Sequence, residues 1–310
     1  MNKLNTAVLT GATGILGTAL IEKLLRENVE MYVICHPGSS RNKDIHQNEK
    51  IHLIDCDLSE ISKIPVLIGK NCDAFFHFAW LGTGNPLNRM DMRLQVRNIQ
   101  YALDAVDAAK KLGCKVFVGA GSQAEYGRID GIIHHDSPTN PISGYGMAKL
   151  CTGEMTRAEC KKYGIRHIWP RIVSVYGRHE RGHSLISTVI DKLLAGEKPP
   201  LTKGEQIWDY LYAGDAADAF YRMAVAGKDG AVYVLGSGKT RTLREFMEAI
   251  RDAIDPTLPL GIGEVPYYPD QAMHLEADIS NLQADTSWRP ETSFEKGIRL
   301  VIEDKKHAER

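Results

Sequence analysis

Short apolar runs alternate with amphipathic stretches along the first half of the chain. The runs are bounded by Gly, Asp or Pro, which is typical of buried strands; they cover residues 6–10, 31–35, 51–56, 73–79, 115–121 and 166–175. Between them, residues 18–28 and 89–111 carry apolar residues at helical spacing. Because strands that alternate with helices form parallel sheets, we expect an α/β fold with helices on both faces of one sheet.

The composition changes after Gly177. Shorter helical and loop segments follow, with prolines at positions 199, 200, 256, 259, 266, 269 and 290. We expect this part to form a smaller domain laid over the carboxyl-terminal edge of the sheet.

A glycine-rich turn, TGATGILG, begins at Thr10, between the first predicted strand and the first predicted helix. Gly11, Gly14 and Gly17 are spaced so that backbone can approach a pyrophosphate closely, and the helix then offers free N–H groups and the positive end of its dipole. The strand–turn–helix context predicts nucleotide binding. The expected contacts in this turn are Gly11, Thr13, Gly14, Ile15 and Leu16.

The end of the second strand favours one form of the cofactor. NAD sites carry an acidic residue about 20 residues beyond the glycine turn, whereas this chain has Cys35 and His36 there. With no carboxylate at those positions, a 2′-phosphate meets no like charge, and it can be contacted by His36, Ser39, Ser40 and Arg41. The sequence therefore favours NADP(H), with NAD(H) as the alternative if Arg41 is only a solvated loop cation.

The stretch ISGYGMAKL, residues 142–150, holds a tyrosine and a lysine four residues apart. If a helix begins near Ser143, Tyr145 and Lys149 lie one turn apart on one face, about 5–6 Å between their Cβ atoms. Taken alone, this spacing is also that of any Tyr/Lys pair on an amphipathic helix, so a catalytic role depends on the rest of the chain.

Together, the glycine turn and the Y-x-x-x-K motif resemble the short-chain dehydrogenase/reductase superfamily. The match is to its extended branch, the nucleotide-sugar epimerases, dehydratases and reductases, and it spans nearly the whole chain. The resemblance implies a Rossmann-type, doubly wound parallel sheet with a smaller C-terminal substrate-binding domain. It places NAD(P) binding in residues 1–172 plus about 209–235, and substrate binding in about 173–208 and 236–310.

Further motifs extend the resemblance. They are Asp57-Leu58, DAFFHFAW, GSQAEYG, PRIVSVYG, WDYLYAGDAADAF and the closing DTSWRPETSFEKGI. Asn98 matches a structural asparagine of the family. The additional cofactor contacts that the resemblance implies are Asp57, Leu58, Phe78, Ala79, Trp80 and Lys149.

The resemblance assigns the catalytic roles to Ser122, Tyr145 and Lys149. The unperturbed pKa of tyrosine is about 10, too high for a good base at neutral pH. We expect Lys149 and the cationic ring of oxidised cofactor to lower the pKa of Tyr145. Ser122 would bind the carbonyl oxygen of the substrate, and Lys149 would also hold the nicotinamide ribose.

Substrate contacts are expected at Thr83, Gln123, Ser174 and Arg178. The basic segment RHERGH, residues 178–183, is interpreted either as a diphosphate contact or as a solvated loop. Two positions depart from the family pattern: Trp208 replaces the usual arginine before Asp209, and Ser174 replaces an asparagine common in the family.

Three functions follow from these motifs. The 4,6-dehydratases of the family carry Asp-Glu after the active-site hydroxyl, whereas this chain has Gln123 and Ala124, which cannot act as acid or base. GSQAEYG and QIWDYLY most resemble 4-reductases of CDP- or dTDP-linked 4-keto-6-deoxyhexoses. The alternative is a nucleotide-sugar 4-epimerase with retained cofactor. A non-catalytic NADP-binding regulator is disfavoured because Tyr145 and Lys149 are both present.

Glu125 is interpreted as a structural or rim carboxylate.

Charge, apolar runs and cysteine usage limit the partners and the cellular location that we expect. Charged residues make up 25% of the 310 and sum to −1, so neither nucleic acid nor a membrane is an expected partner. No apolar run approaches the roughly 20 residues of a membrane span. The six cysteines form no disulfide framework, which favours reduced thiols and a cytoplasmic location. His134 and His135 lack partners at ligand spacing, so no metal site is predicted.

A homodimer is expected from the same resemblance. The helix at residues 89–111 and the helix after Tyr145 resemble a pair that forms a four-helix interface in the family. The apolar stripe of Met92, Val96, Ile99 and Leu103 would supply the contact.

Overall fold

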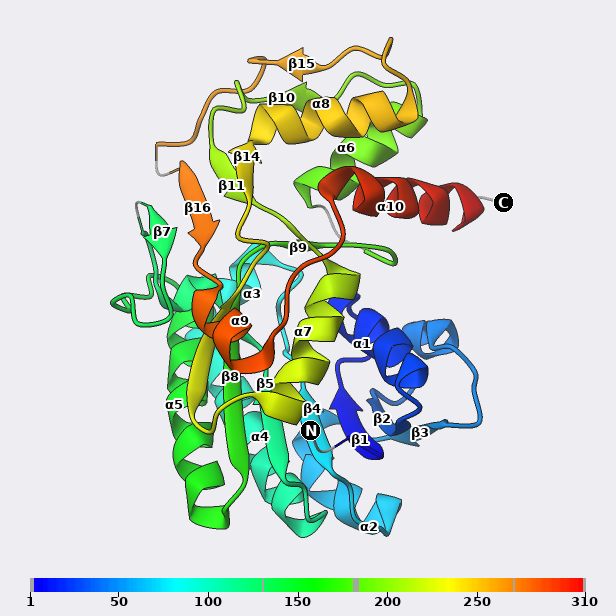
Figure 1. The fold of residues 1–310 in the computed structure, drawn as a ribbon, viewed down its shortest axis with the longest axis vertical. Helices are drawn as coiled ribbons and strands as arrows, with labels where there is room; N and C mark the ends of the chain where they lie inside the picture. Colours follow the sequence, from blue (N-terminus) through cyan, green and yellow to red (C-terminus); the bar gives the residue numbers. More distant parts are fainter. Residues whose placement is uncertain (1–2, 130, 181–183, 270, 309–310) are drawn as a thin grey trace.

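The computed structural model describes residues 3–129, 131–180, 184–269 and 271–308. Its main sheet is parallel, in the order β13-β8-β5-β4-β1-β2-β3, with β6 paired to β8 (Figure 1). The strands are β1 (Thr6–Thr10), β2 (Glu30–Cys35), β3 (Ile51–Asp55), β4 (Ala74–His77), β5 (Val116–Gly119), β6 (Gly121–Ser122), β8 (Arg166–Ile172) and β13 (Ala231–Leu235). The predicted α/β, doubly wound fold is confirmed.

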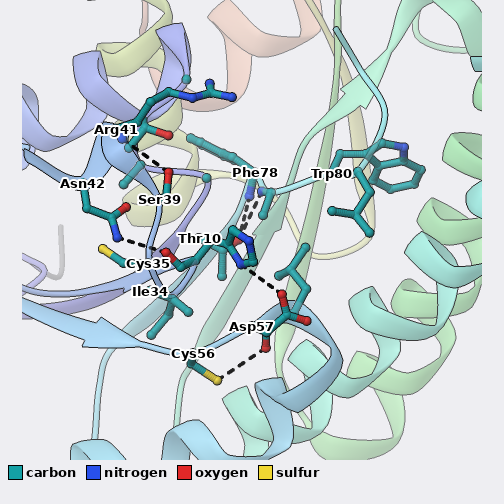
Figure 2. A pocket seen from close by; sticks show the side chains of 18 of the residues that line it. Thr10, Ile34, Cys35, Ser39, Arg41, Asn42, Cys56, Asp57, Phe78 and Trp80 are labelled. Carbon is teal, nitrogen blue, oxygen red and sulfur yellow. Dashed lines mark hydrogen bonds and ion pairs between the residues drawn. The ribbon is translucent and has the colours of Figure 1, made fainter. Parts of the chain in front are cut away.

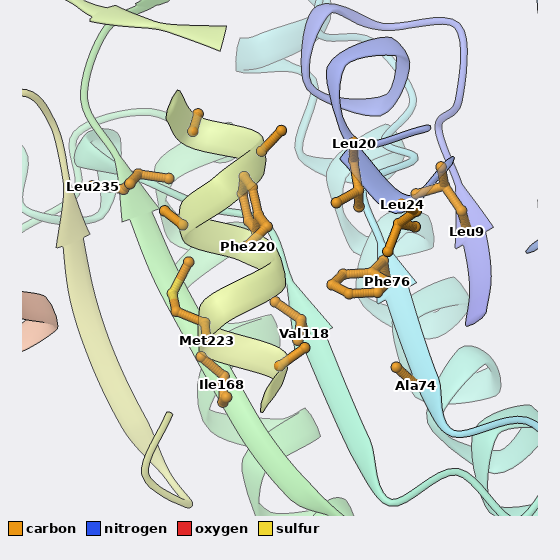
Figure 3. Close-up of a cluster of buried hydrophobic side chains, with 14 of the residues drawn as sticks. Leu9, Leu20, Leu24, Ala74, Phe76, Val118, Ile168, Phe220, Met223 and Leu235 are labelled. Atoms are coloured by element: carbon orange, nitrogen blue, oxygen red, sulfur yellow. The ribbon is translucent and has the colours of Figure 1, made fainter. Parts of the chain in front are cut away.

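Helices cover both faces of this sheet. One face packs against α1 (Ile15–Arg26), α7 (Ala213–Ala226) and α9 (Ser280–Thr286); the other packs against α2 (Ile64–Ile68), α4 (Met92–Lys111) and α5 (Gly144–Tyr163). Alternation along the strands produces the two cores. Phe76 lies with Leu20 and Phe220 on the first face (Figure 3), whereas Phe75 lies with Val106 on the second.

A second group of elements lies above the carboxyl ends of the strands in Figure 1. It contains α6 (Leu185–Leu194), α8 (Leu243–Ile254) and α10 (Phe294–Ala308), which share a core of their own with Ile190, Phe246 and Ile298. Short strands complete it: β10 (Pro200–Leu201) with β15 (Gly261–Ile262), β9 (Val175–Tyr176) with β12 (Leu211–Tyr212), and the sheet of β14 (Thr240–Thr242), β11 (Ile207–Asp209), β16 (His274–Ala277) and β7 (Ile132–Ile133).

Helix boundaries differ from the prediction in two places. The expected helix at residues 89–111 is two helices, α3 (Pro86–Met90) and α4, because the Asp91 side chain caps α4 by accepting from the amides of Arg93 and Leu94. Helix α1 begins at Ile15, directly after the glycine turn, and not at residue 18. The start of α5 is as predicted: the Ser143 hydroxyl accepts from the Gly146 amide at 3.1 Å.

Short 3₁₀ helices join the larger elements. They are η1 (Ser40–Asp44), η2 (Leu58–Lys63) and η3 (Gln123–Glu125). All six cysteines are free thiols, and five of them are buried. Over the ranges that the structure describes, no helix combines the length and apolar character needed to cross a membrane.

Gly17 tests the packing of the glycine turn. A Cβ at Gly17 would overlap the carbonyl oxygen of Gly11 and the backbone of Ala12, neither of which is a flexible side chain. We predict that Gly17→Ala destabilises the protein by about 1–3 kcal/mol, measured by urea unfolding. Gly84→Ala is the control, because a Cβ at Gly84 meets open space. Equal stability of the two variants would contradict this account of the turn.

Candidate active site

A cavity of about 320 Å³ lies at the carboxyl ends of β1, β2 and β4 (Figure 2). The strand order changes direction between β1 and β4, and such a switch point is where open α/β sheets bind ligands. The lining residues are Thr10, Gly11, Ala12, Thr13, Gly14, Ile34, Cys35, His36, Ser39, Arg41, Asn42, Ile45, Cys56, Asp57, Leu58, Phe78, Ala79, Trp80, Leu81 and Thr83. Most of the expected cofactor contacts therefore line this cavity. The exceptions are Ile15, Leu16, Ser40 and Lys149.

The glycine turn lies directly against the end of β4. Gly11 has φ +76°, and a Cβ there would come within 2.6 Å of the Ala79 amide nitrogen. The Thr10 hydroxyl accepts from the amides of Phe78 and Ala79, each at 3.2 Å. Gly14 stands at the N-cap of α1 and has no side chain to cap it, so the first-turn amides remain available to an anion. This cradle fits the pyrophosphate of a dinucleotide.

A carboxylate does lie at the end of the second strand, contrary to the prediction. Asp57, supplied from the turn after β3, has Oδ2 3.0 Å from His36 Nδ1. Its Oδ1 accepts from the Ser59 amide at 2.9 Å and from the Ser59 hydroxyl at 2.6 Å. These hydrogen bonds, with His36 adding to them, lower the pKa of Asp57. The sequence argument missed this pair because the two residues are 21 positions apart and follow different strands.

The loop after β2 is folded by its own side chains. The Arg41 amide donates to the Ser39 hydroxyl at 3.4 Å, and Asn42 Nδ2 donates to the His36 carbonyl at 3.0 Å. Arg41 itself is exposed on the pocket rim. Asn42 and Ile45 line the pocket but were not predicted, because no charge or motif marks them.

Lys149 is buried beneath Trp80. Its Nζ donates to the Ala120 carbonyl at 2.6 Å and lies 3.5 Å from the centroid of the Trp80 ring. Burial lowers the pKa of Lys149 to about 7; Glu125 opposes this shift, and Arg89 adds to it. Burial at this position therefore disfavours the ammonium form of Lys149 relative to an exposed lysine.

Tyr145 is affected differently from the expectation. Burial raises its pKa, while a hydrogen bond with Ser122 and the charge of Arg89 act in the opposite direction. The Arg89 guanidinium carbon lies 4.4 Å from the centroid of the Tyr145 ring, nearer than Lys149 Nζ at 5.7 Å. Arg89, on α3, is thus a cation at this site that the sequence analysis did not identify. The one sequence signal for it was its position in the segment that follows the fourth strand.

Buried amides hold the loop that carries Trp80. The Trp80 indole N–H donates to Gln95 Oε1 at 2.9 Å, and Gln95 Nε2 donates to the Asn88 carbonyl at 2.9 Å. Asn98 accepts from the Leu81 amide at 2.8 Å and donates to the Leu81 carbonyl at 3.1 Å. Asn98 therefore has the structural role that the resemblance implied.

The expected substrate residues do not form one cluster. Thr83 lies on the cavity wall and Gln123 is half-buried beside Ser122. Ser174 accepts from the Trp208 indole N–H at 3.0 Å. Arg178 lies beside α1, where it donates to both carboxylate oxygens of Glu22 at 2.8 and 2.6 Å. There it lines a different pocket from the main cavity. Residues 181–183 of the basic segment lie outside the described residues.

A second cavity of about 250 Å³ lies in the upper part of the molecule, between α6, α8 and the strands β10 and β15. Its lining is mainly apolar with a few polar side chains: Leu185, Pro200, Leu201, Thr202, Gly204, Gln206, Leu243, Arg244, Met247, Ile262, Val265 and Gln271.

His134 has a carboxylate partner that the sequence did not reveal: its Nδ1 lies 2.8 Å from Asp278 Oδ2. Among the residues that the structure describes, no three His, Cys, Asp or Glu side chains are grouped so that they could hold a metal ion. Of the two interpretations of Glu125, the structural carboxylate agrees with its full burial, and the rim carboxylate is wrong.

Comparison with known proteins agrees with this geometry. Residues 7–236 match the NAD dependent epimerase/dehydratase family. A putative UDP-glucose 4-epimerase of Methanocaldococcus jannaschii is 24% identical over 309 residues, which cover 95% of this chain and 96% of that protein.

Solved structures share the fold. UDP-N-acetylglucosamine 4-epimerase from Methanobrevibacter ruminantium M1, in complex with UDP-N-acetylmuramic acid, aligns with a TM-score of 0.87 at 24% identity over 99% of this chain and 100% of that chain. RMD from Pseudomonas aeruginosa, complexed with NADPH, aligns with a TM-score of 0.80 at 21% identity over 98% and 99% of the two chains.

The family match covers well over half of the chain, and the glycine cradle and the Tyr145–Lys149 helix occur in the same structure. The chain belongs to the NAD dependent epimerase/dehydratase family, in the extended branch of the short-chain dehydrogenases/reductases.

Proposed function

We propose that this protein is an NAD(P)-dependent nucleotide-sugar oxidoreductase that reduces the 4-keto group of an NDP-4-keto-6-deoxyhexose, with the nucleotide CDP or dTDP. The observation that carries the proposal is that Ser122 and Tyr145 lie close enough to interact, beside the buried Lys149, at the edge of the sheet that holds the dinucleotide cradle. A hydroxyl pair and a nearby amine are the groups that a carbonyl reduction requires.

Each residue has a separate task in this reaction. When bound, NADPH supplies the hydride. The Ser122 hydroxyl donates a hydrogen bond to the carbonyl oxygen and fixes its place, and Tyr145 Oη gives that oxygen its proton. The Arg89 cation over the ring stabilises the phenolate that remains. Lys149, whose Nζ now lies against the Trp80 ring, would hold the nicotinamide ribose of the bound cofactor.

Gln123 and Ala124 favour this reaction over dehydration. A dehydratase needs an acid and a base beside the active-site hydroxyl, and an amide and a methyl group supply neither. The alternative function is 4-epimerisation with a retained cofactor. The names of two relatives favour it, since both are described as 4-epimerases. The third and least favoured candidate function is a non-catalytic regulator that binds NADP.

The upper cavity supports a nucleotide-linked substrate. Its apolar walls suit a pyrimidine ring, and Gln206, Thr202 and Arg244 offer hydrogen bonds and one positive charge. Arg244 Nε donates to Glu248 at 2.9 Å, so its charge is partly neutralised. We therefore assign this cavity to the base of the sugar nucleotide.

Turnover with a panel of nucleotide sugars tests the function. We predict that 4-keto-6-deoxyhexose nucleotides consume added NADPH in a 1:1 ratio, and that Tyr145→Phe lowers kcat at least about a hundredfold through loss of the proton donor. Cofactor affinity and unfolding temperature should stay near those of the wild type. Interconversion of 4-hydroxyl epimers without added NADPH would support the epimerase instead, and near-normal turnover of Tyr145→Phe would remove Tyr145 from the mechanism.

We propose a preference for NADP(H), despite the carboxylate of Asp57. Asp57 is already bound by Ser59 and His36, and Arg41 can swing from the rim to meet a 2′-phosphate. One charge-assisted hydrogen bond is worth about 1.5–3 kcal/mol, or roughly tenfold or more in affinity. Calorimetry should therefore show tighter binding of NADPH than of NADH in wild type.

Arg41→Ala is predicted to abolish most of this difference, while Lys43→Ala, an exposed cation of the same 3₁₀ helix, should leave it intact. Equal affinities in wild type, or a preference that survives in Arg41→Ala, would refute this assignment.

We also propose that the protein is a homodimer. Two residues of the predicted stripe, Met92 and Val96, are 49% and 61% exposed, and Leu87 and Met147 on the neighbouring helices are 78% and 44% exposed. Large apolar side chains that are exposed on neighbouring helices are typical of an interface. Ile99 and Leu103 are half-buried within the subunit and contribute less.

Light scattering at micromolar concentration should give twice the monomer mass for wild type. Val96→Glu should give the monomer mass, because two carboxylates would meet across a two-fold axis. Val66→Glu is the control, since Val66 is 85% exposed on α2, away from this surface. A monomeric wild type is the result that rejects the dimer.

A further inference from the structure

A carboxylate is buried directly behind the active-site serine. Glu125 has 0% exposure, and three donors surround it. Oε1 accepts from the Ser122 amide at 2.8 Å and from the Trp169 indole N–H at 3.0 Å, while Oε2 accepts from Arg171 Nε at 2.7 Å. A buried charge is tolerated only when paired and hydrogen-bonded in this way.

The contact with Ser122 is a capping box. Ser122 is the N-cap of η3: its hydroxyl oxygen accepts from the Ala124 amide at 3.2 Å, while Glu125, the third residue of the turn, accepts from the Ser122 amide. A hydroxyl that already accepts from the backbone keeps its own hydrogen for donation. The geometry of this turn therefore decides where the Ser122 hydroxyl can donate.

The other side of the carboxylate is anchored to rigid structure. Trp169 and Arg171 lie on β8, inside the sheet. The Trp169 ring is enclosed by glycines: a Cβ at Gly153 would lie 2.7 Å from the ring nitrogen, and one at Gly119 would overlap the ring. The Arg171 guanidinium carbon lies 4.5 Å from the centroid of the Tyr126 ring. The Trp169 ring therefore has little room to follow a mobile carboxylate.

We propose, resting on the function proposed above, that Glu125 is a positioning residue for the reaction: its carboxylate ties the Ser122 backbone to strand β8 and so fixes the direction of the Ser122 hydroxyl. An apolar side chain at this position would fill the same space without holding the Ser122 amide. Because Glu125 is fully buried behind Ser122, its positioning effect is exerted through the Ser122 backbone, in addition to the effect of its charge on Lys149 and Tyr145.

The test compares two double variants that both lack the buried ion pair. Glu125→Gln/Arg171→Met keeps an amide oxygen that can accept from the Ser122 N–H. Glu125→Met/Arg171→Met keeps a side chain of similar size without that acceptor. Both replace the pair by neutral groups, which avoids leaving an unpaired buried charge. If the second variant fails to fold by circular dichroism, Glu125→Leu/Arg171→Met takes its place.

The readout is the phenolate titration of Tyr145, followed by ultraviolet absorbance and isolated by subtracting Tyr145→Phe in the same background. Ser122 lowers the pKa of Tyr145 through its hydrogen bond, so Ser122→Ala should raise the titration midpoint wherever Ser122 is correctly placed. Arg89 and Lys149, which face the Tyr145 ring, are unchanged in both backgrounds. Both backgrounds also lack the charges of Glu125 and Arg171.

We expect Ser122→Ala to raise the midpoint in the Glu125→Gln/Arg171→Met background and to change it by less than half as much in the Glu125→Met/Arg171→Met background. Equal rises in both backgrounds would overturn the proposal, because a merely structural carboxylate alters stability but not the coupling of Ser122 to Tyr145. This titration needs neither sugar nor cofactor, so it decides the role of Glu125 even if the proposed reductase activity is absent.

Where the enzyme does reduce the 4-keto sugar, turnover gives a second test. The variant without the acceptor should have a kcat at least about tenfold below that of the Gln-containing variant, and the difference should vanish once Ser122→Ala is added to both. A difference that persists without the Ser122 hydroxyl would show that Glu125 does not act through it, and would reject the proposal.

Discussion

The close contact between the ends of β1 and β4 is the constraint on which the site depends. Thr10 binds the Phe78 and Ala79 amides, and Gly11 has no Cβ to keep the two segments apart. This contact brings the glycine turn beside the loop that carries Trp80, and Trp80 in turn covers Lys149 on α5. Elements from three separate βα units are therefore held at one edge of the sheet by a hydroxyl and a missing side chain.

Burial, more than any single charge, sets the acid–base properties of this edge. It lowers the pKa of Lys149 and raises that of Tyr145, so the pair does not simply exchange a proton as an exposed Lys–Tyr pair would. His77, buried behind them, has its pKa lowered to about 3 by burial, with Lys149 acting in the same direction. The guanidinium of Arg89 beside the phenol is charged throughout, because an arginine keeps its proton at any physiological pH.

Local patterns predicted most strands of the main sheet, the glycine turn and the start of the helix near Ser143, because each depends on residues that are close in sequence; β13 was not among the predicted strands. Pairings between distant segments escaped prediction. Asp57 meets His36 between the ends of two neighbouring strands, Arg89 reaches Tyr145 from a helix that precedes it by more than 50 residues, and the Glu125 carboxylate pairs with Arg171 of β8. The break at Asp91 was a missed local signal, since an aspartate before a helical run is a common N-cap.

The two departures from the family pattern are one structural unit. A partly buried indole N–H needs an acceptor. The indole N–H of Trp208 donates to the Ser174 hydroxyl at 3.0 Å, and Ser174 lies in the segment between two other strands. Either residue alone would leave the other with a lost or unmet hydrogen bond, so the pair is understood only together. At the position where the resemblance implied an arginine, this chain thus has an indole ring with a satisfied hydrogen bond. A substrate phosphate would have to find its positive charge elsewhere, and in the upper cavity that charge is Arg244, partly neutralised by Glu248.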